Sequence, residues 1–248
     1  MRTYPLYIFD LDGTLFRGEE PTPNAVDTLV EIRRRGAQVR FLTNNSGRSV
    51  AWLQEKLHRL GFRASASEIM TSGVGAAHYL RGRGLGSAFV VGEPALIDAL
   101  EAGGVPVFKQ GPVDAVVVGI CRNFTYDWMN EALQRLIGGA KLVATNPDVT
   151  YPLEGGRLEP GAGAVLAGIQ TCSGVEPEVV GKPNPYLVKL ILAEAQVAPE
   201  DALVVGDRPE TDLLAGTRAG CPTHLVLCGV TQTAPLGCSS SADLSGLL

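Results

Sequence analysis

Short apolar, β-branched runs alternate with helical patterns along almost the whole chain, and this alternation limits the fold more than any other feature. Runs at residues 6–9, 39–42 and 203–205 are separated by stretches with helical spacing. Strands of a parallel sheet read as continuous apolar runs because helices cover both of its faces. The sequence therefore predicts the α/β class, with a Rossmann-like, doubly wound parallel sheet as its core.

Glycines mark the ends of the first two predicted helices. Gly36 ends a helix expected over about 23–35, and Gly61 ends one over 48–60. Further helices are expected at 75–80, 94–102, 126–137 and 186–195, and further strands at 88–91, 115–118, 142–144 and 224–227. The tail from Pro235, rich in serine and small residues, is predicted to be loosely held.

The pattern restarts at Gly84 and forms what resembles a complete smaller unit. Residues 84–178 carry a net charge of −6, although the whole chain carries only −5. This shift in composition predicts an inserted α/β domain at 84–178, between core segments 1–83 and 179–248.

Composition excludes several classes of function. Of the 248 residues, 45% are hydrophobic, enough for a sizeable core, and Lys and Arg are scattered, so no basic stripe could follow nucleic acid. The chain has no run of about 18 apolar residues that would predict a membrane span. Its N-terminus leads directly into the first predicted strand, so we expect a cytoplasmic protein. Five cysteines without a Cys-x-x-Cys pair indicate reduced thiols rather than disulfides or a zinc site.

Polar residues follow the apolar runs at the points where the predicted strands end. Asp10 and Asp12 follow the first run, Thr43 and Asn44 another, and Asp207 a third. Ligands of open parallel sheets bind beyond the carboxyl ends of the strands, so these residues should converge. Of two neighbouring carboxylates, one can attack phosphorus while the other moves protons, and both can help hold a hard divalent cation. The sequence thus predicts a phosphoryl-transfer site.

The motifs together resemble the haloacid dehalogenase superfamily of aspartate-nucleophile phosphatases. They are Asp10-x-Asp12-Gly13-Thr14, a strand-terminal Thr43, Lys182 between Gly181 and Pro183, and Gly206-Asp207-x-x-x-x-Asp212, in the expected order. Leu42-Thr43-Asn44-Asn45, Gly181-Lys182-Pro183 and Gly229-Val230-Thr231 look more narrowly like the NagD and 4-nitrophenylphosphatase subfamily, whose cap is of class IIA. The resemblance covers essentially the whole chain and implies that the inserted unit is this cap.

The resemblance also implies the catalytic roles and a Mg²⁺ cofactor. Asp10 would be the nucleophile that forms an aspartyl-phosphate, and Asp12 the acid and base. Mg²⁺ would be bound by the Asp10 carboxylate, the Asp12 backbone carbonyl and Asp207, an oxygen set that this ion prefers. Asp212 would support these ligands from outside the coordination sphere.

Lys182, Thr43 and Asn44 would bind the substrate phosphate. Lys182 would also favour the ionised form of Asp10, and Thr43 and Asn44 would present a hydroxyl and backbone N–H groups near the start of a helix.

Asn146 and Asp148 lie in the segment Thr145-Asn146-Pro147-Asp148, which follows the predicted strand 142–144. This segment looks like the subfamily's substrate-facing cap loop, and it is equally a strong β-turn sequence. Both interpretations stay open, because turns and binding loops often coincide. Residues 154–163 are expected to hold a hairpin and the start of a helix.

The predicted function is Mg²⁺-dependent hydrolysis of small phosphomonoesters, such as nucleoside monophosphates or sugar phosphates, with 4-nitrophenyl phosphate as an artificial substrate. The partner is then a small phosphorylated metabolite, and neither nucleic acid nor a membrane is expected. A homodimer is left open, since caps of this kind can mediate one. The alternatives are a phosphomutase and a non-catalytic phospholigand-binding or regulatory module.

Overall fold

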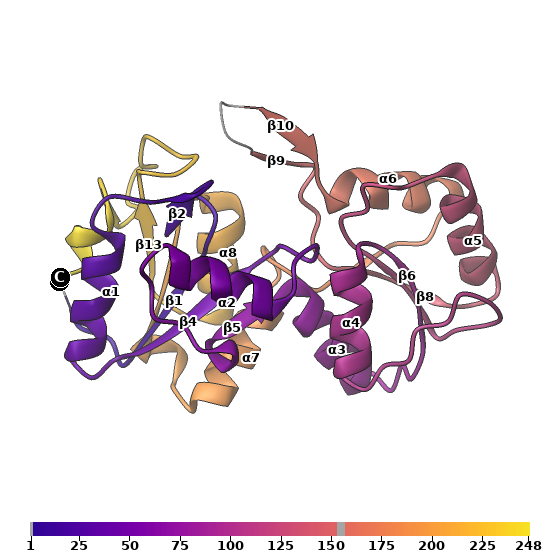
Figure 1. The fold of residues 1–248 in the computed structure, drawn as a ribbon, viewed down its shortest axis with the longest axis horizontal. Coiled ribbons are helices and arrows are strands. Elements are labelled where there is room, and N and C mark those ends of the chain that lie inside the picture. The colour runs from indigo at the N-terminus through magenta and orange to yellow at the C-terminus, as the bar shows by residue number, and fades with distance from the viewer. Residues whose placement is uncertain (1, 153–156) are drawn as a thin grey trace. The chain divides into compact units, whose positions relative to one another are not determined.

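The computed structural model describes residues 2–152 and 157–248, which form two compact units (Figure 1). The first unit takes the described residues of Met1–Thr43, Val50–Met70 and Lys182–Leu248. The second takes those of Asn44–Ser49 and Thr71–Gly181. Each unit contains a parallel sheet with helices, so the predicted α/β class with an inserted smaller unit is confirmed.

The sheet that carries the first unit has six strands in the order β14-β13-β12-β1-β4-β5. In that order they are Ser240–Ser241, Thr223–Val226, Ala202–Gly206, Leu6–Phe9, Gln38–Thr43 and Ile69–Thr71. Strand β1 pairs in parallel with β12 and β4, and β13 pairs in parallel with β12 and β14. The parallel direction brings the carboxyl ends of β1, β4 and β12 to one edge.

Helices of the first unit use apolar faces to cover this sheet. They are α1 (Ala25–Arg34), α2 (Val50–Arg59), α7 (Tyr186–Ala195) and α8 (Leu214–Ala219), with a π-helical turn at Pro209–Leu213 and a short hairpin of β2 (Phe16–Arg17) and β3 (Glu20–Pro21). In α1, Leu29 and Ile32 are buried at helical spacing. They join Tyr7 and Phe9, alternate residues of β1, in one core cluster.

The C-terminal segment is integrated into the first unit, which corrects the expectation of a loose tail. Strand β14 pairs with β13, and the 3-10 helix Leu244–Leu247 follows it. Leu244 and Leu247 are buried in the same core cluster as α1. Two leucines in a sequence otherwise dominated by small residues are enough to anchor the segment.

The second unit has a four-stranded parallel sheet in the order β11-β8-β7-β6. The strands are Glu178–Val179, Lys141–Ala144, Ala115–Val118 and Ala88–Val91, and the helices are α3 (Ser72–Gly82), α4 (Pro94–Ala102), α5 (Tyr126–Ile137) and α6 (Ala162–Ser173). Helices α5 and α6 share a core with β6, β7 and β8. An antiparallel hairpin of β9 (Thr150–Pro152) and β10 (Leu158–Pro160) precedes α6. The predicted hairpin over 154–163 falls partly on residues outside the described ranges.

The main segment of the second unit runs from Thr71, earlier than the boundary expected at Gly84, to Gly181 rather than to residue 178. Helix α3 belongs to it because small residues allow α3 to pack closely on α4. A Cβ on Gly73 would lie 3.4 Å from Ala99, and one on Gly103 would lie 2.4 Å from Ala77. The segment Asn44–Ser49 also belongs to this unit, which the sequence pattern did not indicate.

Candidate active site

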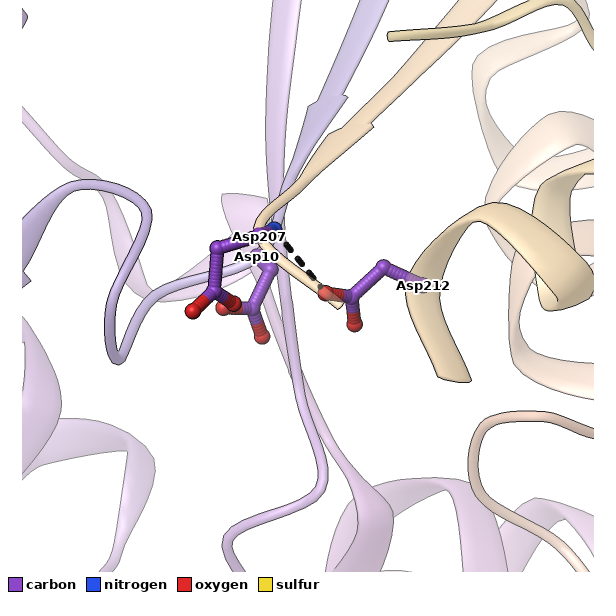
Figure 2. Close-up of side chains that lie close together, drawn as sticks. All are labelled: Asp10, Asp207 and Asp212. Atoms are coloured by element: carbon purple, nitrogen blue, oxygen red, sulfur yellow. Dashed lines mark hydrogen bonds between the residues drawn. The ribbon is translucent and has the colours of Figure 1, made fainter. Parts of the chain in front are cut away.

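Three of the predicted site residues stand at the carboxyl edge of the first unit's sheet. Asp10 directly follows β1, Thr43 is the last residue of β4, and Asp207 directly follows β12. Because these strands are neighbours and parallel, their ends place the side chains together. Figure 2 shows the carboxylates of Asp10 and Asp207 side by side, with Asp212 approaching from the turn that follows β12.

Lys182 joins two of these carboxylates. Its Nζ donates to Asp10 Oδ1 at 2.5 Å and to Asp212 Oδ1 at 2.7 Å. The side chains of Lys182 and Asp212 are only 4% and 3% exposed. Burial alone would lower the pKa of Lys182, but the charges of Asp10 and Asp212 outweigh it and raise this pKa above its ordinary value. The two carboxylates therefore favour the ammonium form of Lys182.

Asp212 uses its carboxylate to hold the turn after β12. Its Oδ2 accepts hydrogen bonds from the backbone N–H groups of Asp207 (3.2 Å) and Arg208 (3.0 Å), and its Oδ1 accepts from Lys182 and from the Thr211 hydroxyl. Both oxygens thus have protein donors. This arrangement fits the supporting role that the sequence predicted for Asp212.

Asp207 differs from Asp212 because one of its oxygens has no protein donor. Its Oδ2 accepts from the backbone N–H of Val230 at 2.6 Å, whereas Oδ1 is buried and has no hydrogen-bond partner among the described residues. Burial and the charge of Asp212 raise the pKa of Asp207 to about 6, against the opposing effect of the Val230 N–H. A buried anionic oxygen without a donor is costly unless a cation is bound there.

Glycines make room for Asp207. A Cβ on Gly13 would lie 2.3 Å from its carboxylate, and a Cβ on Gly229 would lie 2.2 Å from it. Gly13 also has a φ of +95°, a conformation that residues with a Cβ rarely adopt. The glycine in Asp10-x-Asp12-Gly13 is therefore required by the fold of the site, and the same crowding explains Gly229 in the Gly229-Val230-Thr231 motif.

Asp10 and Asp12 occupy different environments. Asp10 is 9% exposed and its Oδ2 accepts from the Thr14 hydroxyl at 3.2 Å. Burial raises the pKa of Asp10 well above its ordinary value, even though the Lys182 ammonium favours the charged form. Asp12 is exposed and is held through a backbone bridge to Phe16. One carboxylate is fixed and enclosed, and the other is open to approach by a reactant or water.

Three carboxylates, those of Asp10, Asp207 and Asp212, offer ligand atoms that lie within 4.8 Å of one another. Within this cluster the ammonium of Lys182 pairs with the carboxylates of Asp10 and Asp212, so one positive charge faces three carboxylates. Burial is the largest cause of the raised pKa of Asp10 and of Asp207, and the neighbouring carboxylates raise both further. An added divalent cation would restore the balance and lower both.

The predicted phosphate-binding pair is divided between the two units. Thr43 is 3% exposed and belongs to the first unit, and Asn44 begins the next segment of the second. Helix α2 begins only at Val50, so the expected helix start does not directly adjoin these residues. The Asn44 side chain donates from Nδ2 to Asp148 Oδ2 at 3.0 Å.

Asn146 and Asp148 follow β8 in the second unit, as predicted, but Asn146 is enclosed. It is 4% exposed, and its amide bonds to the Asn44 carbonyl at 2.7 Å. The roles of Thr14 and of the Val230 N–H were not foreseen. Thr14 belongs to the Asp10-x-Asp12-Gly13-Thr14 motif and Val230 to the Gly229-Val230-Thr231 motif. The sequence motifs therefore included both residues but did not predict what each would do.

Comparison with known proteins places this geometry in a family. The model of haloacid dehalogenase-like hydrolases matches residues 7–106, and a HAD-hydrolase-like model matches residues 179–243. Human glycerol-3-phosphate phosphatase is 36% identical over 265 residues, which cover 95% of this chain and 83% of the human protein. The chain belongs to the haloacid dehalogenase-like hydrolase family.

Solved structures narrow the position within this hydrolase family. NagD from Escherichia coli K-12 superimposes with a TM-score of 0.89 at 33% identity and covers 98% of both chains. A glycerol phosphate phosphatase from Mycobacterium tuberculosis, solved in complex with magnesium, gives a TM-score of 0.90 at 35% identity and covers 99% of this chain and 76% of its own. The predicted resemblance to NagD-like phosphatases is confirmed. Among the described residues, every helix is too short or too polar to cross a membrane.

Proposed function

We propose that this haloacid dehalogenase-like hydrolase cleaves small phosphomonoesters by transferring the phosphoryl group to Asp10, with Mg²⁺ as its cofactor. The observation that carries the proposal is the Asp10 carboxylate at the end of β1, hydrogen-bonded to a buried Lys182 and beside Asp207. The relatives that are named phosphatases support the same reaction class.

The first step would break the ester bond. A carboxylate oxygen of Asp10 attacks phosphorus, a new oxygen–phosphorus bond forms, and the bond from phosphorus to the leaving oxygen breaks. Asp12 gives its proton to that oxygen, so the product leaves as an alcohol rather than as an alkoxide. Such positioned proton transfer is worth roughly 10²- to 10⁴-fold in rate.

The second step would release phosphate. Asp12, now a carboxylate, takes a proton from a water molecule whose oxygen attacks the phosphorus of the aspartyl-phosphate. The bond between Asp10 and phosphorus breaks, and the Asp10 carboxylate is restored together with inorganic phosphate. Because Asp12 is exposed, its carboxylate can contact the leaving oxygen in the first step and the water molecule in the second.

The residues present fit a magnesium ion. The buried Asp207 Oδ1 has no donor among the described residues, and it lies in a cluster of hard oxygen ligands. We propose that Asp207, the Asp10 carboxylate and the Asp12 backbone carbonyl hold the ion. When bound, Mg²⁺ would supply positive charge that offsets the negative charge of the transferring phosphoryl group.

Lys182, Thr43 and Asn44 are proposed to bind the phosphate oxygens. Lys182 already touches Asp10, so one ammonium could hold nucleophile and phosphate together. The relatives' names indicate glycerol 3-phosphate and ribonucleoside monophosphates as the first substrates to try.

The test is phosphate release from a panel of phosphomonoesters that includes these substrates and 4-nitrophenyl phosphate, with Mg²⁺ and with EDTA. We expect release only with the metal and its loss in the Asp10→Asn variant, which keeps the side-chain size, leaves Lys182 paired with Asp212 and should therefore fold. Release by that variant would contradict the aspartyl-phosphate route. No release from any substrate by the native protein, with phosphorylated ligands still raising its Tm, would favour the binding-module alternative. A phosphorylated isomer without free phosphate would favour the mutase.

A further inference from the structure

Asn146 is a buried side chain whose hydrogen-bonding groups are used inside the second unit. Its Nδ2 donates to the Asn44 carbonyl at 2.7 Å and to Thr145 Oγ1 at 3.3 Å, and its Oδ1 accepts from the Asp148 N–H at 3.1 Å. A carbonyl can only accept and an N–H can only donate, so these partners fix the orientation of the amide. Both amide hydrogens are occupied, and recognising a substrate with them would require breaking a bond.

Asn44 is held at two points. Its carbonyl accepts from Asn146 and also from the Ser72 hydroxyl at 2.7 Å. Its side-chain amide donates to Asp148. Since peptide groups are planar, two donors on the Asn44 carbonyl fix the peptide that follows this residue. Asn44 directly follows Thr43, the residue proposed to bind phosphate.

Gly181 packs into the same cluster. Its N–H donates to the Thr145 carbonyl at 2.9 Å. A Cβ at this position would lie 2.6 Å from Asn44 Oδ1 and 3.3 Å from the Cβ of Asn146, so a larger residue would displace them. Gly181 directly precedes Lys182. One cluster, formed by Asn44, Thr145, Asn146, Asp148 and Gly181, therefore holds the chain neighbours of both Thr43 and Lys182.

We propose that Asn146 is a positioning residue for phosphate binding: through Asn44 and Gly181 it sets the orientation of the chain at Thr43 and Lys182, and it does not contact the leaving group. This inference rests on the proposed function. The proposal differs from the interpretation of Asn146 as a substrate-facing loop residue in the effect that it predicts for a substitution of this residue. A phosphate-site residue acts equally on all substrates, whereas a leaving-group contact distinguishes between them.

The experiment compares Asn146→Ala with the native protein in steady-state kinetics on glycerol 3-phosphate, a ribonucleoside monophosphate and 4-nitrophenyl phosphate. Inorganic phosphate serves as competitive inhibitor. Because small misplacements of a catalytic group are costly, we expect kcat/KM to fall by about 10- to 100-fold for all three substrates. The inhibition constant of phosphate should rise. An unchanged inhibition constant, with losses that differ widely between substrates, would overturn the proposal.

Two further variants keep the test decisive. Ser72→Ala removes the other donor to the Asn44 carbonyl from a different element, so it should give the same uniform pattern with a smaller loss, even if Asn146→Ala folds poorly. The inference would be contradicted if the inhibition constant of phosphate stayed at its native value in Ser72→Ala and also in Asn146→Ala, where that variant folds. Asn130→Ala, which removes an exposed asparagine of α5 whose amide contacts Gln134, is the matched control and should behave as native.

Calorimetric titration with inorganic phosphate separates this inference from the proposed function. If the native protein releases no phosphate from any ester, the proposed function fails. Weaker phosphate binding by Asn146→Ala would still support the positioning role, and equal binding by the two proteins would contradict it.

Discussion

At the scale of single residues, the central interaction is the pair of buried ion pairs that Lys182 makes with Asp10 and Asp212. Lys182 bonds to Asp10 and Asp212 with little solvent access. Removing one partner of such a group is much more costly than the interaction is favourable, because it leaves buried charge without a partner. The site is thus kept in place by the same charges that are proposed to do its chemistry.

Lys182→Met should destabilise the protein as well as inactivate it. The methionine keeps most of the side-chain volume but leaves Asp10 and Asp212 without their cation, so we expect a loss of about 3–5 kcal/mol in the free energy of unfolding. Denaturant titration in EDTA measures it, with Lys189→Met on the exposed surface of α7 as control. A variant as stable as the native protein would show that the buried ion pairs contribute nothing to the fold.

His224 gives the first unit a pH dependence independent of the active site. It is fully buried and lies between the hydroxyls of Ser239 and Ser241, each 2.8 Å from a ring nitrogen. Burial lowers the pKa of His224 below its ordinary value of 6.5. The unfolded chain therefore takes up a proton more readily than the folded protein.

The expected result is a free energy of unfolding that is independent of His224 above about pH 7.5 and decreases as the pH falls from 6.5 towards the lowered pKa. The slope from this residue cannot exceed about 1.4 kcal/mol per pH unit. Denaturant titrations at pH 5 to 8 should show this component in the native protein, whereas His224→Gln should lack it. Parallel pH profiles for the two proteins would be inconsistent with a buried neutral histidine.

At the scale of helices and strands, the apolar runs and the helical spacing in the sequence predicted most of the elements. For some of them the predicted bounds were also correct. Helices α4, α5 and α7 begin and end where the sequence places them. A proline stands at the start of α4 and directly before α7, Thr125 caps α5, and each helix has buried apolar residues. Strand β5 and helix α8 were not predicted. They are short, at Ile69–Thr71 and Leu214–Ala219, and are stabilised by neighbours distant in sequence.

The positions of the candidate site residues at one edge of the sheet could be predicted for the same reason. Asp10, Thr43 and Asp207 follow apolar strands directly, so a linear motif reports their position in space. The enclosure of Asn146 could not be predicted, because it depends on Asn44, which lies far away in the chain. Turn sequences and substrate loops use the same residues, and only the three-dimensional contacts distinguish them.

The C-terminal helical turn provides a direct test of the corrected tail. Leu244 is completely buried in the first unit's core, whereas Leu236 is fully exposed. Leu244→Ala should cost about 2–5 kcal/mol of unfolding free energy, the usual range for a buried leucine, and Leu236→Ala should cost almost nothing. Thermal or denaturant unfolding of both variants checks this, and equal stability would mean that the tail is loosely held after all.

At the scale of the whole molecule, the chain passes between the two units next to residues that are proposed to bind phosphate. One passage lies between Thr43 and Asn44, and another between Gly181 and Lys182. The sequence predicted an inserted unit and placed its end near this second passage. It could not predict that 44–49 joins the inserted unit, since a short polar segment carries no pattern that assigns it to one core or the other.

The central claim, that a phosphoryl group is transferred to Asp10, can be tested by trapping the intermediate. The reaction with glycerol 3-phosphate and Mg²⁺ would be quenched in acid within one turnover, and the peptides would be analysed by mass spectrometry. Asp12→Asn, which should lack the base that hydrolyses the intermediate, should prolong its lifetime when 4-nitrophenyl phosphate, with its better leaving group, is used. The account predicts a phosphoryl group on the peptide containing Asp10 and none in Asp10→Asn. Rapid turnover with no phosphorylated peptide, or with the group on another residue, would contradict it.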